Sequence, residues 1–92
     1  MFNVLGENMA IVTMYCTDSC PFCINAEKLL LSKGVEIEKI DIEVEANKFA
    51  EIVAQIGQDS VPQIFINGRH IGGFDDLSEL DMDDELEPLL GL

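Results

Sequence analysis

The sequence lacks most of the features that would indicate a nucleic-acid-binding, membrane or secreted protein. It has no tryptophan, one histidine, and only five Lys and Arg residues against 18 Asp and Glu, for a formal net charge of −13. So acidic a chain is repelled by nucleic acid and by anionic membrane surfaces, and neither is expected as a partner. No stretch reaches the ~20 apolar residues of a membrane span. Residues 1–8 contain neither a basic segment nor a long apolar core, so no secretory signal is expected there.

What is present suits one small globular domain. The chain has 92 residues, of which 48% are hydrophobic, enough for a single modest core. We predict one domain over residues 1–92, in which residues 1–8 are a loose N-terminal extension. Three cysteines in a chain without an export signal indicate a reducing compartment, where paired cysteines are catalytic rather than structural. The cytoplasm is the expected location.

The segment Cys20-Pro21-Phe22-Cys23 lies where an apolar, β-favouring run passes into a helical pattern. Two cysteines three residues apart on the first turn of a helix lie on one side of it, close enough to form a disulfide. Cys20 would occupy the N-terminal end, where unpaired backbone N–H groups and the helix dipole favour a thiolate, so its pKa is expected below the free-thiol value of ~8.5. The spacing therefore predicts a redox-active pair, with Cys20 as nucleophile and Cys23 as resolving thiol.

Other uses of these cysteines are less well supported. A zinc site would need a second pair of Cys or His ligands, and the only histidine is His70, which we expect to be a plain hairpin side chain. Together with Cys16 the pair forms the Cys-x3-Cys-x2-Cys spacing of radical-SAM iron–sulfur enzymes, but those need a much larger barrel. Cys16 is expected to be a packed thiol at the end of a central strand.

The apolar pattern also predicts the order of helices and strands. It indicates strands at 10–15 and 35–42, helices at 21–33, 46–56 and 74–86, and a hairpin at 63–71 turning on Asn67-Gly68. Because a strand–helix–strand unit is parallel and right-handed, the assembly is an α/β, thioredoxin-like fold with a four-stranded mixed sheet flanked by three helices. It places Val61-Pro62 and residues 73–76 around the N-terminus of the first helix.

The first two helices carry apolar stripes that should face the core. The stripe of the first helix is expected to comprise Phe22, Ala26, Leu29, Leu30 and Lys33, and that of the second Ala46, Phe49, Ala50, Val53 and Ile56.

Three motifs in this order resemble the small bacterial dithiol glutaredoxins. They are Tyr15 with the Cys20–Cys23 segment, Ser60-Val61-Pro62, and residues 71–77 (Ile-Gly-Gly-Phe-Asp-Asp-Leu). The likeness extends from about residue 10 to residue 90. It implies a glutathione-dependent thiol-disulfide oxidoreductase that reduces protein disulfides and glutathione mixed disulfides, with glutathione as co-substrate and no metal.

The resemblance also implies which residues bind glutathione. Pro62 would be cis and would leave the Val61 backbone free to pair with the tripeptide, while Asp75 and Asp76 would hold its γ-glutamyl end. The full set that the resemblance implies is Thr17, Phe22, Val61, Pro62, Gly73, Asp75 and Asp76. Without the resemblance, the two aspartates would be read simply as first-turn residues that match the helix dipole.

The chain departs from that family at three basic positions. The family usually has Lys at the place of Thr17, a basic or glutamine side chain at Phe49, and often Arg within 58–59, and these groups hold the glycine carboxylate of glutathione. Exposed ion pairs contribute ~0.2–1 kcal/mol each, so their loss should weaken binding about tenfold to a hundredfold. The pKa of Cys20 should also be lowered less than in relatives with the lysine.

Two alternatives follow from these departures and from the cysteines. The first is a thioredoxin-like electron carrier reduced by a flavoprotein reductase. The second is a carrier of a two-iron cluster shared between monomers, which Pro21 disfavours. The resemblance further suggests a monomer whose partners are disulfide-bearing or glutathionylated proteins, with ribonucleotide reductase as one possibility.

Overall fold

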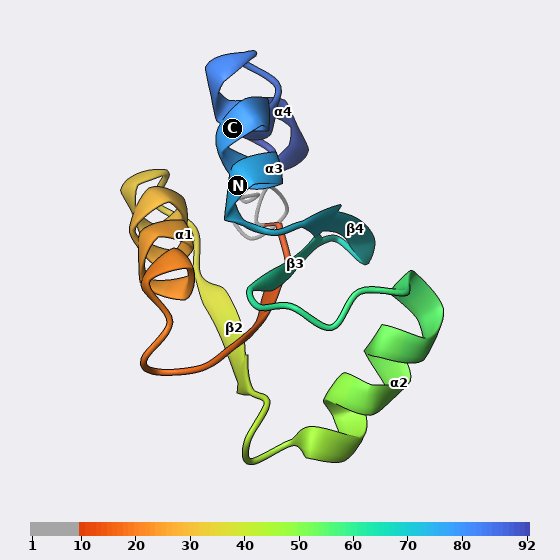
Figure 1. Ribbon diagram of the computed structural model, residues 1–92. Coiled ribbons are helices and arrows are strands. Elements are labelled where there is room, and N and C mark those ends of the chain that lie inside the picture. Colours follow the sequence, from red (N-terminus) through yellow and green to blue (C-terminus); the bar gives the residue numbers. More distant parts are fainter. Residues whose placement is uncertain (1–9) are drawn as a thin grey trace, which may run out of the picture.

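The computed structural model describes residues 10–92 as a four-stranded sheet with helices on both faces (Figure 1). Its strands are β1 (Val12–Cys16), β2 (Ile37–Asp41), β3 (Gln63–Ile66) and β4 (Arg69–Gly72), and its helices are α1 (Pro21–Ser32), α2 (Ala46–Ile56), α3 (Phe74–Met82) and α4 (Leu86–Leu89). The extension predicted at residues 1–8 lies outside the described residues. Within residues 10–92, no helix is both long and apolar enough to cross a membrane.

The sheet has the predicted mixed topology. Its strand order is β2-β1-β3-β4, with β1 parallel to β2 and antiparallel to β3, and with β3 antiparallel to β4. The parallel pair requires a crossover, which α1 supplies, whereas the β3–β4 pair needs only a tight turn. Asn67 and Gly68 form that turn with φ of 53° and 82°, the left-handed values of a type I′ hairpin. The thioredoxin-like arrangement is confirmed.

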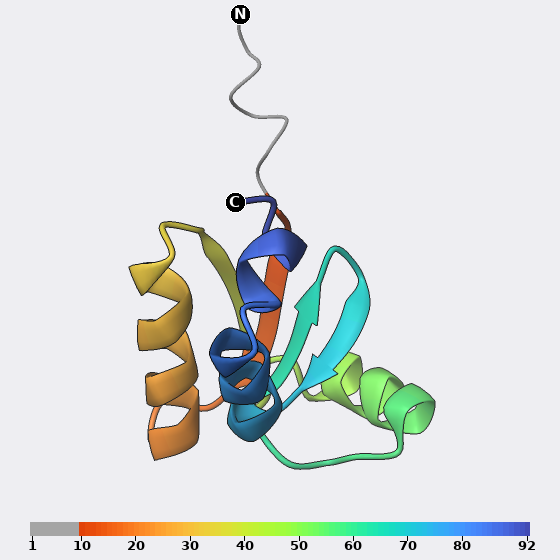
Figure 2. The ribbon, with the colours of Figure 1, turned by 90° about the horizontal axis from the view of Figure 1, so that it is seen from above.

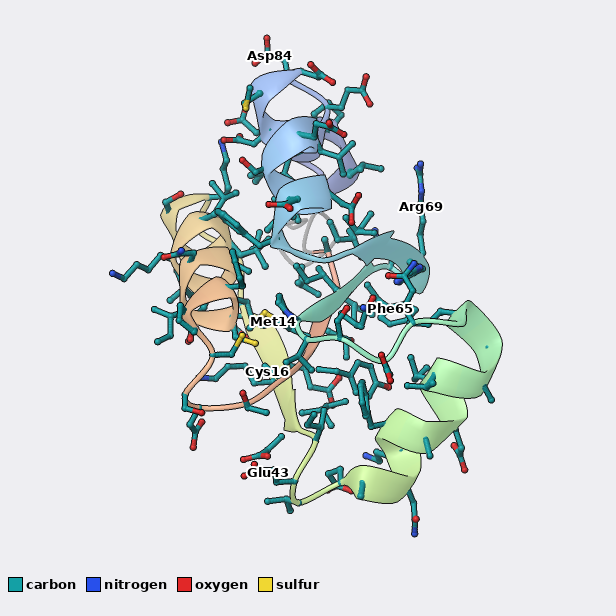
Figure 3. The ribbon with its side chains drawn as sticks, viewed as in Figure 1. Met14, Cys16, Glu43, Phe65, Arg69 and Asp84 are labelled. Carbon is teal, nitrogen blue, oxygen red and sulfur yellow. The ribbon has the colours of Figure 1, made fainter. Side chains whose placement is uncertain are left out.

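The two faces of the sheet pack against different helices (Figure 2). Alternation along β1 directs Val12, Met14 and Cys16 into the main core with α1 and α3, on the side where Figure 3 labels Met14 and Cys16. Tyr15 faces the opposite side, where its ring centroid lies 6.2 Å from that of Phe49 on α2. The main core lies on the face that α1 and α3 cover. Cys20 also lies on this side of the sheet, because it immediately precedes α1.

The buried stripe of α1 differs from the prediction. Its fully buried residues are Cys23, Ala26 and Leu30, whereas Phe22 is 56% exposed. Cys23 lies at the i, i+3, i+7 spacing of the core face, and Phe22, one residue earlier, is rotated about 100° away from it. The second thiol therefore takes the inward position that was predicted for the phenylalanine.

The face of α2 is also less buried than predicted. The helix has the predicted bounds, but none of its residues is fully buried, and Ala46 and Ala50 are exposed. A single helix covers this face, so its flanks stay open to solvent, whereas α1 and α3 shield each other on the opposite face. Only Phe49, Ile52, Val53 and Ile56 are partly buried.

The last predicted helix, 74–86, is in fact two helices. Asp84 has a φ of 60°, the Glu85 N–H donates to the Leu80 carbonyl at 2.8 Å, and the Asp84 N–H donates to the Asp81 carbonyl at 3.2 Å. This is the Schellman pattern that ends a helix, with Asp84 at the end of α3 remote from its N-terminus (Figure 3). The turn redirects the chain so that Leu86 is fully buried.

Candidate active site

Cys20 is the residue immediately before α1. Its backbone is extended, with φ of −88° and ψ of 117°, and its carbonyl accepts the first bond of the helix from the Ile24 N–H at 3.1 Å. Pro21 fills the first helical position, where the missing N–H costs nothing and φ is already helical. The predicted passage from a strand to a helix N-terminus at Cys20 is confirmed.

The surroundings of Cys20 favour its thiolate. Partial burial, the largest single influence, raises the pKa of Cys20, but three hydrogen bonds to the sulfur outweigh it and hold the pKa below the ordinary thiol value. These bonds come from the backbone N–H groups of Cys23 and Phe22 and from the Cys23 thiol. The two backbone N–H groups are unpaired donors of a helix N-terminus, as the sequence predicted.

Cys23 has the opposite character. The pKa of Cys23 is raised to about 12, chiefly by burial. The neighbouring Cys20 sulfur contributes to this rise through a hydrogen bond and through charge, whereas the Thr17 backbone N–H lowers the pKa. Cys16 is buried at the end of β1, and burial raises its pKa as well. All three cysteines are free thiols. Only one of them is therefore suited to attack at neutral pH.

This difference predicts selective alkylation. With iodoacetamide, we expect only Cys20 to react near neutral pH, because the thiolate is the reactive form and the pKa of Cys20 is lowered. As the pH falls through that lowered pKa, the thiolate takes up a proton and the rate declines. Peptide mapping by mass spectrometry across a pH series measures this, with Cys23 as the internal comparison. A midpoint for Cys20 at or above the free-thiol value of ~8.5 would contradict the helix N-terminus argument.

A groove of about 290 Å³ lies beside Cys20. It is lined by Phe22 from α1, by Gln58, Ser60, Val61 and Pro62 from the loop before β3, and by Gly73, Phe74, Asp75 and Asp76 at the start of α3. The Cys20 Sγ lies 3.8 Å from the Val61 carbonyl oxygen, so the sulfur borders this groove. Another hollow, of about 340 Å³, lies among residues 10–12 and 36–38. Its lining includes neither Val61 nor any residue of the segment 20–23, so the chemistry belongs to the groove.

The groove brings together six of the seven residues expected to bind glutathione. These are Phe22, Val61, Pro62, Gly73, Asp75 and Asp76. Thr17 does not line it, and instead its backbone N–H reaches the Cys23 sulfur. The peptide bond between Val61 and Pro62 is cis, as the resemblance implied.

The start of α3 forms the acidic wall of the groove. Asp76 Oδ2 accepts a hydrogen bond from the Gly73 N–H at 3.0 Å, so the carboxylate caps its own helix. Within residues 10–92, no Lys or Arg lines the groove. Lys33 pairs with Asp81 and Glu87 at the other end of α1. Phe49, where the resemblance implied a basic or glutamine side chain, packs against Tyr15.

Sequence reasoning missed four residues of this region. Gln58, Ser60 and Phe74 line the groove, and Gln63, which contacts Gln58 and Ser60, is fully buried. The signal for Gln63 was a polar residue at the first position of an otherwise apolar strand. As for metals, no group of three or more His, Cys, Asp or Glu side chains in the part of the chain described here is placed to hold an ion.

Comparison with known proteins identifies relatives over nearly the whole chain. A family model described as "Glutaredoxin" matches residues 12–71. "Glutaredoxin 3" of Escherichia coli (strain K12) is 46% identical over 82 residues, which cover 89% of this chain and 99% of that protein. A glutaredoxin of Neisseria meningitidis (serogroup A) is 45% identical over 83 residues, covering 89% of this chain and 98% of that protein.

Solved structures are similar as well. The crystal structure of a buckwheat glutaredoxin–glutathione complex matches with a TM-score of 0.81 and 30% identity, over 88% of this chain and 76% of that one. The solution structure of glutaredoxin from Brucella melitensis matches with a TM-score of 0.79 and 38% identity, over 91% of each chain.

Proposed function

The chain belongs to the glutaredoxin family of glutathione-dependent thiol-disulfide oxidoreductases, and we propose that Cys20 is its nucleophile and Cys23 its resolving thiol. The observation that carries this assignment is the Cys20 sulfur at the N-terminus of α1, with a lowered pKa, at the edge of the groove. A thiolate that is both stabilised and accessible is what attack on a disulfide requires.

In the first step, the Cys20 thiolate attacks the glutathionyl sulfur of a mixed disulfide. A new S–S bond forms between Cys20 and glutathione, and the protein substrate leaves as a thiolate that takes up a proton. In the second step, a glutathione thiolate attacks the Cys20-bound glutathionyl sulfur. Oxidised glutathione is released and the Cys20 thiolate is restored, so that two electrons have passed from glutathione to the substrate.

For a protein disulfide, Cys23 resolves the intermediate. While Cys20 is a thiolate, its charge and its hydrogen bond help to raise the pKa of Cys23. When Cys20 becomes part of a mixed disulfide it carries no charge, so both influences disappear and the pKa of Cys23 falls. Cys23 then attacks Cys20 Sγ, expels the substrate thiolate and leaves an internal disulfide that two molecules of glutathione reduce.

We propose that the groove holds the glutathionyl part of the substrate. The Val61 backbone would pair with the tripeptide in an extended, strand-like manner, and the N-terminus of α3 would receive its γ-glutamyl carboxylate. Asp75 and Asp76 would attract the ammonium group, while Phe22, Pro62 and Gly73 would shape the walls. Thr17 would stand near the glycine end, where it offers no positive charge. The buckwheat relative, solved as a glutathione complex, supports glutathione as the ligand.

The setting of the reaction is part of the same proposal. Disulfide-bearing and glutathionylated proteins are the expected protein partners, and the family resemblance suggests ribonucleotide reductase among them. We propose a monomer that works in the cytoplasm, because a reducing compartment supplies the glutathione that regenerates the two thiols.

One observation favours a second candidate, an electron carrier reduced by a flavoprotein reductase. No basic side chain in the described residues lines the groove, so the glycine carboxylate of glutathione would have no ionic partner there. Such a carrier would use the same two cysteines but would exchange electrons with the reductase instead of with glutathione.

Incubation of Cys23→Ser with oxidised glutathione separates the two candidates. We expect Cys20 of this variant to gain one glutathionyl group, which mass spectrometry detects, because the resolving thiol that would expel it is gone. The matched control is the variant in which both Cys20 and Cys23 are serine, which should gain none. Absence of the adduct on Cys23→Ser would instead favour the reductase-fed carrier.

A further inference from the structure

Among residues 10–92, Gln63 is the one polar side chain that is fully buried. It is the first residue of β3 and pairs with Tyr15 of β1, on the face of the sheet that α2 covers. A buried amide costs free energy unless its donors and acceptors are paired. The partners of Gln63 therefore indicate what the side chain does.

The Gln63 amide joins the hairpin to the loop before β3. Its Nε2 lies 3.0 Å from the Ser60 carbonyl oxygen, 3.3 Å from Ser60 Oγ and 3.4 Å from Gln58 Oε1. Its Oε1 lies 2.7 Å from His70 Nε2. A carbonyl oxygen can only accept, so the nitrogen of the amide must face Ser60, and its oxygen must accept from a His70 Nε2–H. The His70 ring is held in turn beside Phe65, with centroids 5.0 Å apart.

The loop that Gln63 holds has little other hydrogen-bonded support, although Val61 packs against the core and Pro62 is buried. Outside the helices and strands, none of the backbone–backbone hydrogen bonds formed by the described residues involves residues 58–62. Yet this loop supplies four residues to the groove, including Val61, whose carbonyl lies 3.8 Å from Cys20 Sγ. A displacement of Ser60 would move Val61, its neighbour, relative to the sulfur.

We propose that Gln63 is a positioning residue that fixes the Val61 backbone at the distance from Cys20 that a glutathionyl group requires. This inference rests on the proposed function, in which the Val61 backbone pairs with glutathione. The hydrogen bonds that stabilise the Cys20 thiolate come from Phe22 and Cys23, on another element. Loss of the Gln63 contacts should therefore weaken substrate binding and leave the thiolate unchanged.

The Gln63→Glu variant tests this role. The glutamate side chain has the same size and keeps the oxygen that accepts from His70 Nε2. Its second oxygen replaces the Gln63 Nε2 donor, so two acceptors then face each other at the Ser60 carbonyl. We expect the KM for a glutathionylated peptide to rise about tenfold, while kcat stays within about twofold. The pH midpoint of Cys20 alkylation should not move. The rate with dithiodipyridine, a small disulfide that has no peptide backbone to pair with Val61, should also be unchanged.

Two further variants control for misfolding and for the hydrogen bond to His70. Gln63→Met fills a similar space but forms none of the hydrogen bonds, so it should raise KM by a similar factor. It replaces Gln63→Glu in the test if the buried carboxylate of that variant prevents folding. His70→Phe keeps a ring beside Phe65 and removes the hydrogen bond on the side of the amide away from the loop. Because the Ser60 contacts remain, we expect its KM to rise no more than about threefold. Circular dichroism during heating checks that each variant is folded.

The outcomes distinguish the two levels of the proposal. An unchanged KM in folded Gln63→Glu or Gln63→Met, or an equal rise in His70→Phe, would overturn the positioning role alone. So would a parallel fall in kcat and in the dithiodipyridine rate, which would indicate general support of the fold. A wild-type protein that reacts with dithiodipyridine but does not turn over the glutathionylated peptide would refute the proposed function, and the positioning role with it.

Discussion

Replacing Cys20 with serine is expected to abolish reduction of both glutathionylated peptides and protein disulfides. A hydroxyl cannot form the sulfur–sulfur bond of the intermediate, and the donors at the N-terminus of α1 would then surround a group that stays protonated. We expect a loss on the order of 10⁴-fold or more, down to the rate of glutathione alone. The measurement is the production of oxidised glutathione, coupled to its reductase, with and without the protein.

The comparison with Cys16→Ser makes this result specific. Cys16 is a buried thiol with a raised pKa at the end of β1, so its replacement should leave the exchange rate within about twofold of wild type. If Cys20→Ser kept substantial activity while Cys16→Ser lost it, the nucleophile would be Cys16 and the present assignment would be wrong. A small loss of stability in Cys16→Ser, caused by the buried hydroxyl, would not affect this comparison.

The parts of the fold that the sequence predicts are those set by short segments of chain. The bounds of α2, the turn at Asn67-Gly68 and the start of α1 at Pro21 each depend on a few adjacent residues with strong conformational preferences. The break between α3 and α4 does not depend on such local preferences. It requires Asp84 in a left-handed conformation, which an aspartate tolerates but does not demand, and it is stabilised by the burial of Leu86, which is a tertiary effect.

In the site, too, locally determined features could be predicted and features that depend on tertiary packing could not. The reactive pair follows from the spacing of Cys20 and Cys23 and from the helix that begins there, so the environment that stabilises the Cys20 thiolate could be anticipated. The exposure of Phe22 and the inward position of Cys23 depend on how α1 is rotated about its axis, and a stripe with several nearly equivalent apolar positions does not determine that angle. The buried contacts of Gln63 join residues on three segments, and no local pattern reveals them.

Gly72 lies directly beneath the carboxylate that caps α3. Its φ is 120°, in a region that residues with a Cβ rarely adopt. A Cβ on this residue would come within 2.8 Å of Asp76 Cγ and would overlap its Oδ2. That oxygen accepts the Gly73 N–H, so the clash would displace the acidic wall of the groove as well as strain the backbone. A methyl group on residue 72 would therefore disturb the stability and the site together.

The Gly72→Ala variant should therefore lose about 2–3 kcal/mol of unfolding free energy, the sum of the backbone strain and the lost cap. Its KM for a glutathionylated peptide should also rise, because Asp76 can no longer stay where the γ-glutamyl end is expected. Denaturant unfolding and steady-state kinetics measure the two effects. Gly73→Ala is the matched control: its φ of −93° suits any residue, and its Cβ would meet only the Pro62 carbonyl at 3.5 Å. Equal losses of stability in the two variants would show that the clash with Asp76 and the positive φ at residue 72 are not the cause.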